Sequence, residues 1–217
     1  MGTLTRTGYL ISRTELSKVP HQAVVVLGGL KKELTVRPVV NSDYGFPPPP
    51  FKVFRATKDG ICAPRFFGID KMGPPKIDKR PEPAKSTAKF TGKLRDATHQ
   101  NEAFAAAIKA GHGVLSLPCG YGKTTVSLAI ACKLGYRTMI IVHKQFLADQ
   151  WRERIKQFCP GATIGVVQQD KKEVECDFVI AMLQSLSLKE YSFSDFESIG
   201  TLIVDEAHHI CAKVFSQ

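Results

Sequence analysis

Beyond about residue 94, the chain alternates apolar runs of strand length with helical segments, and this alternation restricts the fold more than any other feature. The apolar runs stand at 113–117, 138–143, 163–167, 177–182 and 201–205. Strands that are apolar along their whole length suit a sheet covered on both faces, the usual setting of parallel strands. We therefore expect an α/β fold in which helices flank a doubly wound parallel sheet.

Three helices are expected in the same region. The segments 101–110 and 123–134 have helical composition, and a glycine follows each of them. The third helix carries an apolar stripe at helical spacing, formed by Leu147, Trp151, Ile155 and Phe158. Because Trp151 shares this stripe, we expect it in the core and not on a surface that stacks on bases.

The stretch SLPCGYGKTT, residues 116–125, ends in Gly-Lys-Thr between an expected strand and an expected helix, as a phosphate-binding loop does. Leu117 replaces the first glycine of the general pattern. The backbone N–H groups from Gly120 to Thr124 can converge on phosphate oxygens, with Lys123 as a point charge and Thr124 as a hydroxyl for Mg²⁺. The residues expected to bind the nucleotide are Leu117, Pro118, Cys119, Gly120, Tyr121, Gly122, Lys123, Thr124 and Thr125. We also expect alkylation of Cys119 to block ATP binding, and bound nucleotide to protect it.

A second motif, TLIVDEAHH at 201–209, puts two carboxylates at the end of an apolar run. The carboxyl edge of a parallel sheet is where ligands bind in such folds, so this motif should lie beside the loop. Asp205 is expected to hold Mg²⁺, and Glu206 to orient and deprotonate the attacking water. His208 would connect the nucleotide site to other motifs. The two motifs lie 82 residues apart (205 − 123), and their order is typical of nucleotide hydrolases.

The positive charge of the chain is confined to its first part. Residues 1–93 hold 17 Lys and Arg against 7 Asp and Glu, whereas residues 94–217 hold 13 against 13, so the net charge of +10 lies in the first segment. Such asymmetry favours a nucleic-acid partner, or else a solubilising basic surface. The six cysteines are scattered, and no apolar run is long enough for a membrane span. We expect an intracellular protein with no membrane partner.

Three domains are expected. Residues 1–70 contain short β-type runs at 7–12, 23–29, 34–40, 51–55 and 61–69, which predict a small basic β-rich or α+β domain. Residues 71–93 hold four prolines and seven Lys or Arg, which is typical of an extended and mobile linker. Residues 94–217 form the expected ATP-binding domain.

The segments LPCGYGKTT, IIVHKQFLADQWRERI, VIAMLQSL and LIVDEAHH resemble superfamily 2 helicases of the DEAH-box type. The resemblance points to the branch of XPB-like helicases and of transcript-release helicases of large DNA viruses, over roughly residues 90–217. It implies that residues 94–217 are the first RecA-like lobe of an ATP- and Mg²⁺-dependent motor. It also implies a place in the cytoplasm or nucleus, or in the virion or viral factory of a virus.

The same resemblance implies contacts with nucleic acid, DNA being favoured over RNA, and possible partners in the transcription machinery. Its candidate contact residues are Lys144, Gln145, Gln184 and Ser185, for each of which a solvated surface is the alternative. Gln100 would read the adenine ring, although Arg95 and Gln100 are separated by four residues where the family has two.

A second RecA-like lobe and its arginine have no counterpart in these 217 residues. We therefore expect an N-terminal fragment or one half of a split gene product, poorly active alone, whose second lobe is supplied in cis or in trans. Two alternatives stay open: a non-enzymatic nucleic-acid-binding adaptor that retains one motor lobe, and another phosphate-loop enzyme such as a kinase.

Overall fold

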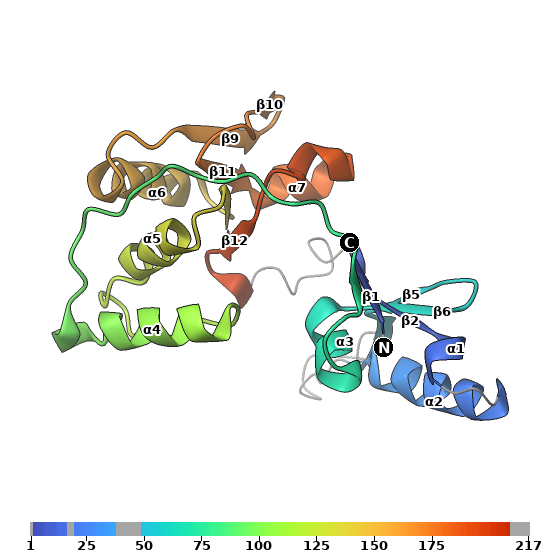
Figure 1. Cartoon of the computed structure of the whole chain (residues 1–217). Coiled ribbons are helices and arrows are strands. Elements are labelled where there is room, and N and C mark those ends of the chain that lie inside the picture. Colours follow the sequence, from blue (N-terminus) through green and yellow to red (C-terminus); the bar gives the residue numbers. More distant parts are fainter. Residues whose placement is uncertain (1, 17–19, 38–48, 209–217) are drawn as a thin grey trace, which may run out of the picture. The chain divides into compact units, whose positions relative to one another are not determined.

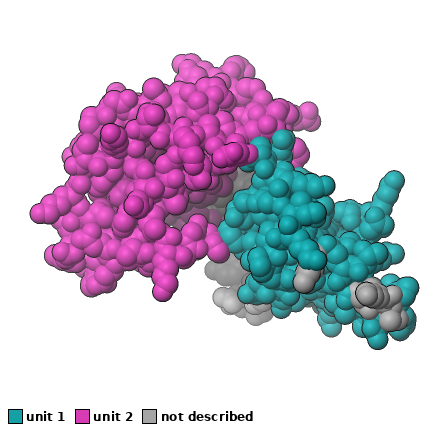
Figure 2. Space-filling view, viewed as in Figure 1, with its two compact units in different colours: residues 1–81 teal, residues 82–217 magenta. Residues whose placement is uncertain are grey.

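The computed structural model describes residues 2–16, 20–37 and 49–208. They belong to two compact units, Met1–Pro81 (unit 1) and Glu82–Gln217 (unit 2), which Figure 1 traces and Figure 2 colours separately. The boundary falls inside the segment 71–93 that the sequence predicts as a linker.

Unit 1 is an α+β unit. Its elements are β1 (Thr3–Thr5), β2 (Gly8–Ser12), α1 (Arg13–Leu16), α2 (Pro20–Glu33), β3 (Thr35–Val36), β4 (Phe51–Lys52), β5 (Arg55–Ala56), β6 (Gly60–Ala63), α3 (Arg65–Met72) and β7 (Ile77–Asp78). The main sheet has the order β5-β6-β2-β1-β7, with β7 parallel to β1 and the other pairs antiparallel. Tyr9, fully buried, links the ends of the unit because its hydroxyl accepts from Gly2 N (2.9 Å) and donates to Gly73 O (3.1 Å).

The prediction of a β-type run at 23–29 is wrong, because these residues lie inside helix α2. Three valines in a row favour a strand, but the cost of β-branched residues in a helix is only a few tenths of a kcal/mol each, roughly. Ala23, Leu27 and Leu30 recur at helical spacing and are all buried in the core of unit 1. Burial of this stripe therefore outweighs the local preference.

The prediction of a β-type run over 61–69 is only half right, since β6 ends at Ala63 and α3 begins at Arg65. The run at 34–40 is strand over Thr35–Val36, and its end from residue 38 lies outside the described residues. The run at 51–55 is divided between β4 and β5.

The segment 71–93 is anchored along its length and is not a free linker. Its first part completes α3 and forms β7. Its second part lies extended on unit 2, where Ala84 N donates to Ser198 O (2.9 Å) and Thr91 N donates to Phe158 O (2.8 Å). Proline-rich composition predicts an extended backbone correctly, but the hydrogen bonds along unit 2 hold this backbone in place.

Unit 2 is built on the α/β plan that the sequence predicts. Its elements are η2 (Asp96–Thr98), α4 (Gln100–Ala110), α5 (Lys123–Leu134), β8 (Thr138–Val142), α6 (Gln145–Phe158), β9 (Ile164–Gln168), β10 (Lys171–Lys172), β11 (Phe178–Met182), α7 (Leu183–Leu188), η3 (Phe193–Phe196) and β12 (Thr201–Val204). The sheet order is β10-β9-β11-β8-β12, and β9, β11, β8 and β12 are parallel. Among the described strands of this sheet, only the short β10 is antiparallel to its neighbour.

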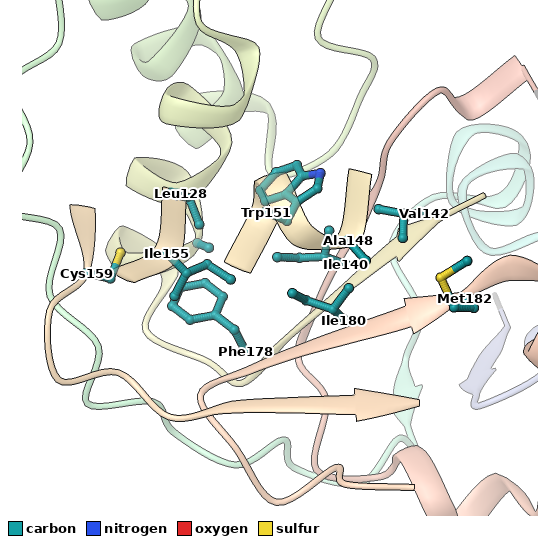
Figure 3. Packing of buried hydrophobic residues seen from close by; sticks show 11 residues of the cluster. Leu128, Ile140, Val142, Ala148, Trp151, Ile155, Cys159, Phe178, Ile180 and Met182 are labelled. Carbon is teal, nitrogen blue, oxygen red and sulfur yellow. The ribbon is translucent and has the colours of Figure 1, made fainter. Parts of the chain in front are cut away.

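Both faces of this sheet are covered, which confirms the doubly wound arrangement. Side chains alternate along a strand, so Ile140 and Phe178 face the cluster formed with α5 and α6, as Figure 3 shows. Met139, the residue before Ile140, and Val179, the residue after Phe178, belong to the cluster on the opposite face, together with Leu183 of α7. The two central strands β8 and β11 are buried at every position.

The predicted strand at 113–117 is not a strand in this structure. The segment is without regular secondary structure, and Val114 is 88% exposed. β-type residues favour an extended backbone, but a strand also needs a neighbour with which to form ladder hydrogen bonds. The described sheet ends at β12, and 113–117 forms no ladder with it.

Candidate functional site: a phosphate loop beside an acidic strand end

The loop predicted to bind phosphate leads directly into α5, whose first residue is Lys123. Gly120 (φ 79°) and Gly122 (φ 77°) both adopt the left-handed conformation, which glycine accepts without strain. A Cβ atom at Gly122 would lie 2.6 Å from Nε2 of Gln100. The glycine at this position is therefore required by both the backbone conformation and the space around it.

Lys123 folds back across its own loop. Its ammonium donates to the carbonyl oxygens of Leu117 (2.9 Å) and Pro118 (3.4 Å). The N–H groups of the first turn of α5 have no helical carbonyl one turn earlier, and the helix dipole makes this end positive. The loop thus offers an ammonium and a helix N-terminus, the combination that binds phosphates in nucleotide sites.

Gln100, the first residue of α4, is buried (1% exposed) and braces this loop. Its Oε1 accepts from Arg95 N (3.0 Å), and its Nε2 donates to Tyr121 O (2.8 Å). These contacts tie the segment before α4 to the loop backbone. Contact of Gln100 with adenine stays a prediction.

The acidic pair follows β12 at the carboxyl end of the parallel sheet. The backbone N–H of Asp205 donates to Ile141 O (3.0 Å) and so prolongs the ladder with β8. Oδ2 of Asp205 accepts from Nε1 of Trp151 (2.8 Å). Glu206 has φ 54°, a left-handed backbone that is uncommon outside glycine, and its Oε2 lies 3.4 Å from Nδ1 of His208. Glu206 and His208 are both exposed.

Helix α5 packs against β12, so the helix that begins with Lys123 and the strand that precedes Asp205 are neighbours. Thr124 supplies a hydroxyl and Asp205 a carboxylate, both hard oxygen ligands. Among the described residues, no group of three or more His, Cys, Asp or Glu could hold a metal ion by itself. Such a sparse oxygen set fits Mg²⁺, which takes one or two protein oxygens and completes its shell with phosphates and water.

The candidate nucleic-acid contacts gather at the same edge of the sheet. Strands β8 and β11 are adjacent and parallel, and Lys144 and Gln145 follow the first while Gln184 and Ser185 follow the second. Gln184 links the two strand ends directly, because its Nε2 donates to His143 O (2.7 Å). Lys144, Gln145 and Gln184 are exposed, and Ser185 is half-buried.

Two of these polar side chains also support neighbouring loops. Oε1 of Gln145 accepts from Nε2 of Gln168 (2.8 Å), and Oγ of Ser185 accepts from Gln169 N (3.0 Å). The structure therefore brings the four residues together, and their contact with a nucleic acid stays a prediction.

Trp151 is the residue of the site that sequence reasoning missed. It is a core residue as predicted (3% exposed), yet its indole N–H reaches Asp205. A signal was available, because a buried indole N–H needs a hydrogen-bond partner. The identity of this partner depends on how α6 packs on the sheet, which the sequence pattern does not reveal.

Comparison with known proteins gives several matches. A protein of Acanthamoeba polyphaga mimivirus described as "Putative ATP-dependent RNA helicase L396" is 34% identical over 227 residues, covering 98% of this chain and 41% of the relative. The "DNA 3'-5' translocase XPB2" of Sulfurisphaera tokodaii is 32% identical over 130 residues, covering 57% of this chain and 27% of the relative.

Among solved structures, the Sulfolobus solfataricus SWI2/SNF2 ATPase core in complex with dsDNA matches with a TM-score of 0.46 at 21% identity, covering 62% of this chain and 30% of that one. This likeness is too weak to carry an argument about the fold.

The chain spans less than half the length of these helicase and translocase relatives. No helix among the described residues is both long and apolar enough to cross a membrane. The family model described as "Type III restriction enzyme, res subunit" matches residues 93–217, more than half of the chain. Because this match covers more than half of the chain, the chain belongs to this family.

Proposed function

We propose that this chain carries the ATP-binding lobe of an ATP-dependent helicase or translocase that moves on nucleic acid, DNA in the first place. The observation that carries the proposal is the packing of α5, which begins with Lys123, against β12, which Asp205 follows. A phosphate-binding lysine and a metal-binding carboxylate on neighbouring elements are the two parts that nucleotide hydrolysis needs.

The roles follow from the chemistry of each group. Lys123 exchanges the carbonyl oxygens of Leu117 and Pro118 for phosphate oxygens when nucleotide binds. Thr124 and Asp205 would hold Mg²⁺, which neutralises the charge that develops on the phosphates. Glu206 orients the attacking water and accepts its proton. His208, whose Nδ1 lies 3.4 Å from Oε2 of Glu206, connects the nucleotide site to other motifs.

Movement on nucleic acid is supported by the residues at the carboxyl edge of the sheet. Lys144, Gln145, Gln184 and Ser185 carry donors suited to a phosphate backbone. Contacts of this kind give affinity without sequence preference, as a motor on any sequence requires. The relatives' descriptions name an RNA helicase in one case and a DNA translocase in another, so the experiment below compares both polymers.

The working motor is proposed to include a second RecA-like lobe, in cis or in trans, because ATP in such motors lies between two lobes. An arginine supplied across the cleft is worth about 10³–10⁵ in rate. We therefore propose that these 217 residues alone turn ATP over slowly, and that the complete protein acts on DNA in transcription or repair, inside the cell.

ATP hydrolysis by the chain, with Mg²⁺ and with single-stranded DNA, double-stranded DNA or RNA, tests the proposal beside a Lys123→Ala variant. Nucleotide binding that is lost in the variant, with turnover by the chain alone little above that of the variant, is the expected result. Turnover that DNA stimulates and that the variant loses would show that the chain works without a second lobe. Nucleotide binding equal in both proteins would refute the site.

The basic first part of the chain, with its net charge of +10, favours one second candidate, a non-enzymatic nucleic-acid-binding adaptor. Tight binding of DNA without any binding of nucleotide would favour it over the motor.

A further inference from the structure

We propose that Trp151 is a positioning residue for Asp205: its indole N–H fixes one carboxylate oxygen, so that the other is presented to the metal ion of the nucleotide. This inference rests on the proposed function, since it assigns to a core residue a part in the same site.

The geometry makes the contact rigid from both sides. Trp151 is 3% exposed and packs with Leu128 and Ala148, and Figure 3 shows its nitrogen on the side of the ring that faces away from Phe178. Nε1 lies 2.8 Å from Oδ2 of Asp205. The backbone of Asp205 is held independently, because its N–H donates to Ile141 O (3.0 Å). A carboxylate held at its backbone and at one oxygen has lost its rotational freedom about the side-chain bonds.

The chemical nature of the donor matters as much as its position. A bond from N–H to an ionised carboxylate is stronger than one between neutral groups. The indole carries no charge, so it orients the carboxylate without neutralising it, whereas a lysine or arginine in the same place would compete with a cation for it. A neutral donor to one oxygen is therefore the arrangement expected of a metal ligand and not of a structural ion pair.

This hydrogen bond also gives the buried indole N–H the partner that it needs. A buried indole N–H without a partner is costly, and the recorded partner of Trp151 is Asp205 itself. Groups that orient metal ligands from outside typically change metal affinity by about 10- to 100-fold when removed. We expect a loss of this size for Mg²⁺ when the N–H is removed.

The test uses the full chain and methylanthraniloyl-ATP, whose fluorescence reports binding, first in EDTA and then during titration with Mg²⁺. Trp151→Phe keeps an aromatic ring in the core and removes the N–H. The Mg²⁺ concentration at half-maximal tightening should rise about 10- to 100-fold, with binding in EDTA unchanged. Phe178→Leu is the matched control, since Phe178 lies in the same core cluster (1% exposed) and has no polar atom. Its loss of volume should lower stability and leave the Mg²⁺ midpoint in place.

Two further measurements separate positioning from packing. In an Asp205→Asn background, Trp151→Phe should add no further loss, because the partner of the N–H no longer holds the metal. Trp151 is the only tryptophan of the chain, so its own emission should change when Mg²⁺ is added to the nucleotide complex, and this change should vanish in Asp205→Asn.

The possible outcomes separate a failure of the inference from a failure of the proposed function. A Mg²⁺ midpoint in Trp151→Phe within twofold of the wild type, or shifted equally in Phe178→Leu, overturns the inference while the proposed function stands. A wild-type chain that binds the nucleotide in neither condition, or binds it without regard to Mg²⁺, refutes the proposed function and the inference with it.

Discussion

Replacing Asp177 with asparagine should destabilise unit 2 by up to about 2 kcal/mol at neutral pH. Asp177, just before β11, joins the extended segment 82–93 to the sheet. Its Oδ1 accepts from Oγ of Ser86 (2.7 Å) and from Thr87 N (3.0 Å), and its Oδ2 accepts from Thr163 N (3.0 Å) and Thr163 Oγ1 (2.8 Å). Asparagine can accept at only one of its two side-chain atoms, so half of this arrangement is lost.

The upper limit of the magnitude follows from the pKa of Asp177, and solvent screening of this partly exposed carboxylate keeps the effect below that limit. Burial raises this pKa, but the hydrogen bonds from Ser86, Thr163 and Thr87 together outweigh burial and lower it from 3.8 to about 2. Each unit of pKa difference between the folded and unfolded states corresponds to about 1.4 kcal/mol. Because the pKa is lower in the folded state, the stabilisation is present above pH 4 or so and disappears as the pH falls through about 2. At pH 3 roughly half of it should remain.

Urea unfolding followed by the emission of Trp151 measures this directly, because the only tryptophan lies in unit 2. The control is Asp170→Asn, which removes the same charge from an exposed ion pair with Lys189 (2.5 Å) and should cause no measurable change. A difference between wild type and Asp177→Asn that stays constant from pH 7 to pH 3 would contradict the argument. So would an equal loss in Asp170→Asn.

Three more results are expected around the loop and the core. Gly122→Ala should destabilise the chain by about 1–3 kcal/mol and weaken nucleotide binding, because a side chain is strained at φ 77° and its Cβ would meet the amide of Gln100. Thermal melts and nucleotide titration check this, and an alanine variant as stable as the wild type would disprove it. Among the cysteines that the structure describes, Cys119 is the exposed one and lies within the loop, so a maleimide should label it before the others in this group. Labelling should abolish nucleotide binding and be slowed by bound nucleotide, and labelled protein that still binds nucleotide would refute this. Cys132 and Cys159, whose sulfur atoms lie 3.6 Å apart in the core, should react far more slowly at neutral pH. The hydrogen bond to Cys159 and burial raise the pKa of the Cys132 thiol, and Cys159 is fully buried. Mass spectrometry of the labelled peptides against time measures this, and labelling as fast as that of Cys119 would contradict it.

Much of unit 2 could be predicted from sequence because its elements are determined locally. Helix α5 begins at Lys123 and ends before Gly135, which adopts the left-handed φ of 71° that favours glycine after a helix. Strands β8 and β11 are continuous apolar runs, and both are buried throughout, as a parallel sheet between two helical layers requires. The positions of the phosphate loop and of Asp205 then follow from the order of strands and helices.

The predictions from sequence were wrong where contacts with distant parts of the chain determine the local structure. The valines at 24–26 favour a strand, but α2 forms because Ala23, Leu27 and Leu30 bury a common face in unit 1. Residues 113–117 have strand composition and no ladder partner among the described residues. The composition of the proline-rich segment before residue 93 predicts a linker. In the structure this segment is held in place, because Ser86 donates a hydrogen bond to Asp177, 91 residues later in the chain.

The candidate site shows the same division. The amino-acid sequence by itself determined which groups the chain brings to the chemistry: a lysine and a threonine after a glycine-rich loop, and two carboxylates after an apolar strand. Only the tertiary structure decided what each group touches, since Gln100 is directed to the loop backbone and the indole of Trp151 to Asp205. The physical reason is that a residue's chemical type and backbone preference are local, whereas a hydrogen-bond partner 54 residues away depends on how a helix packs on a sheet.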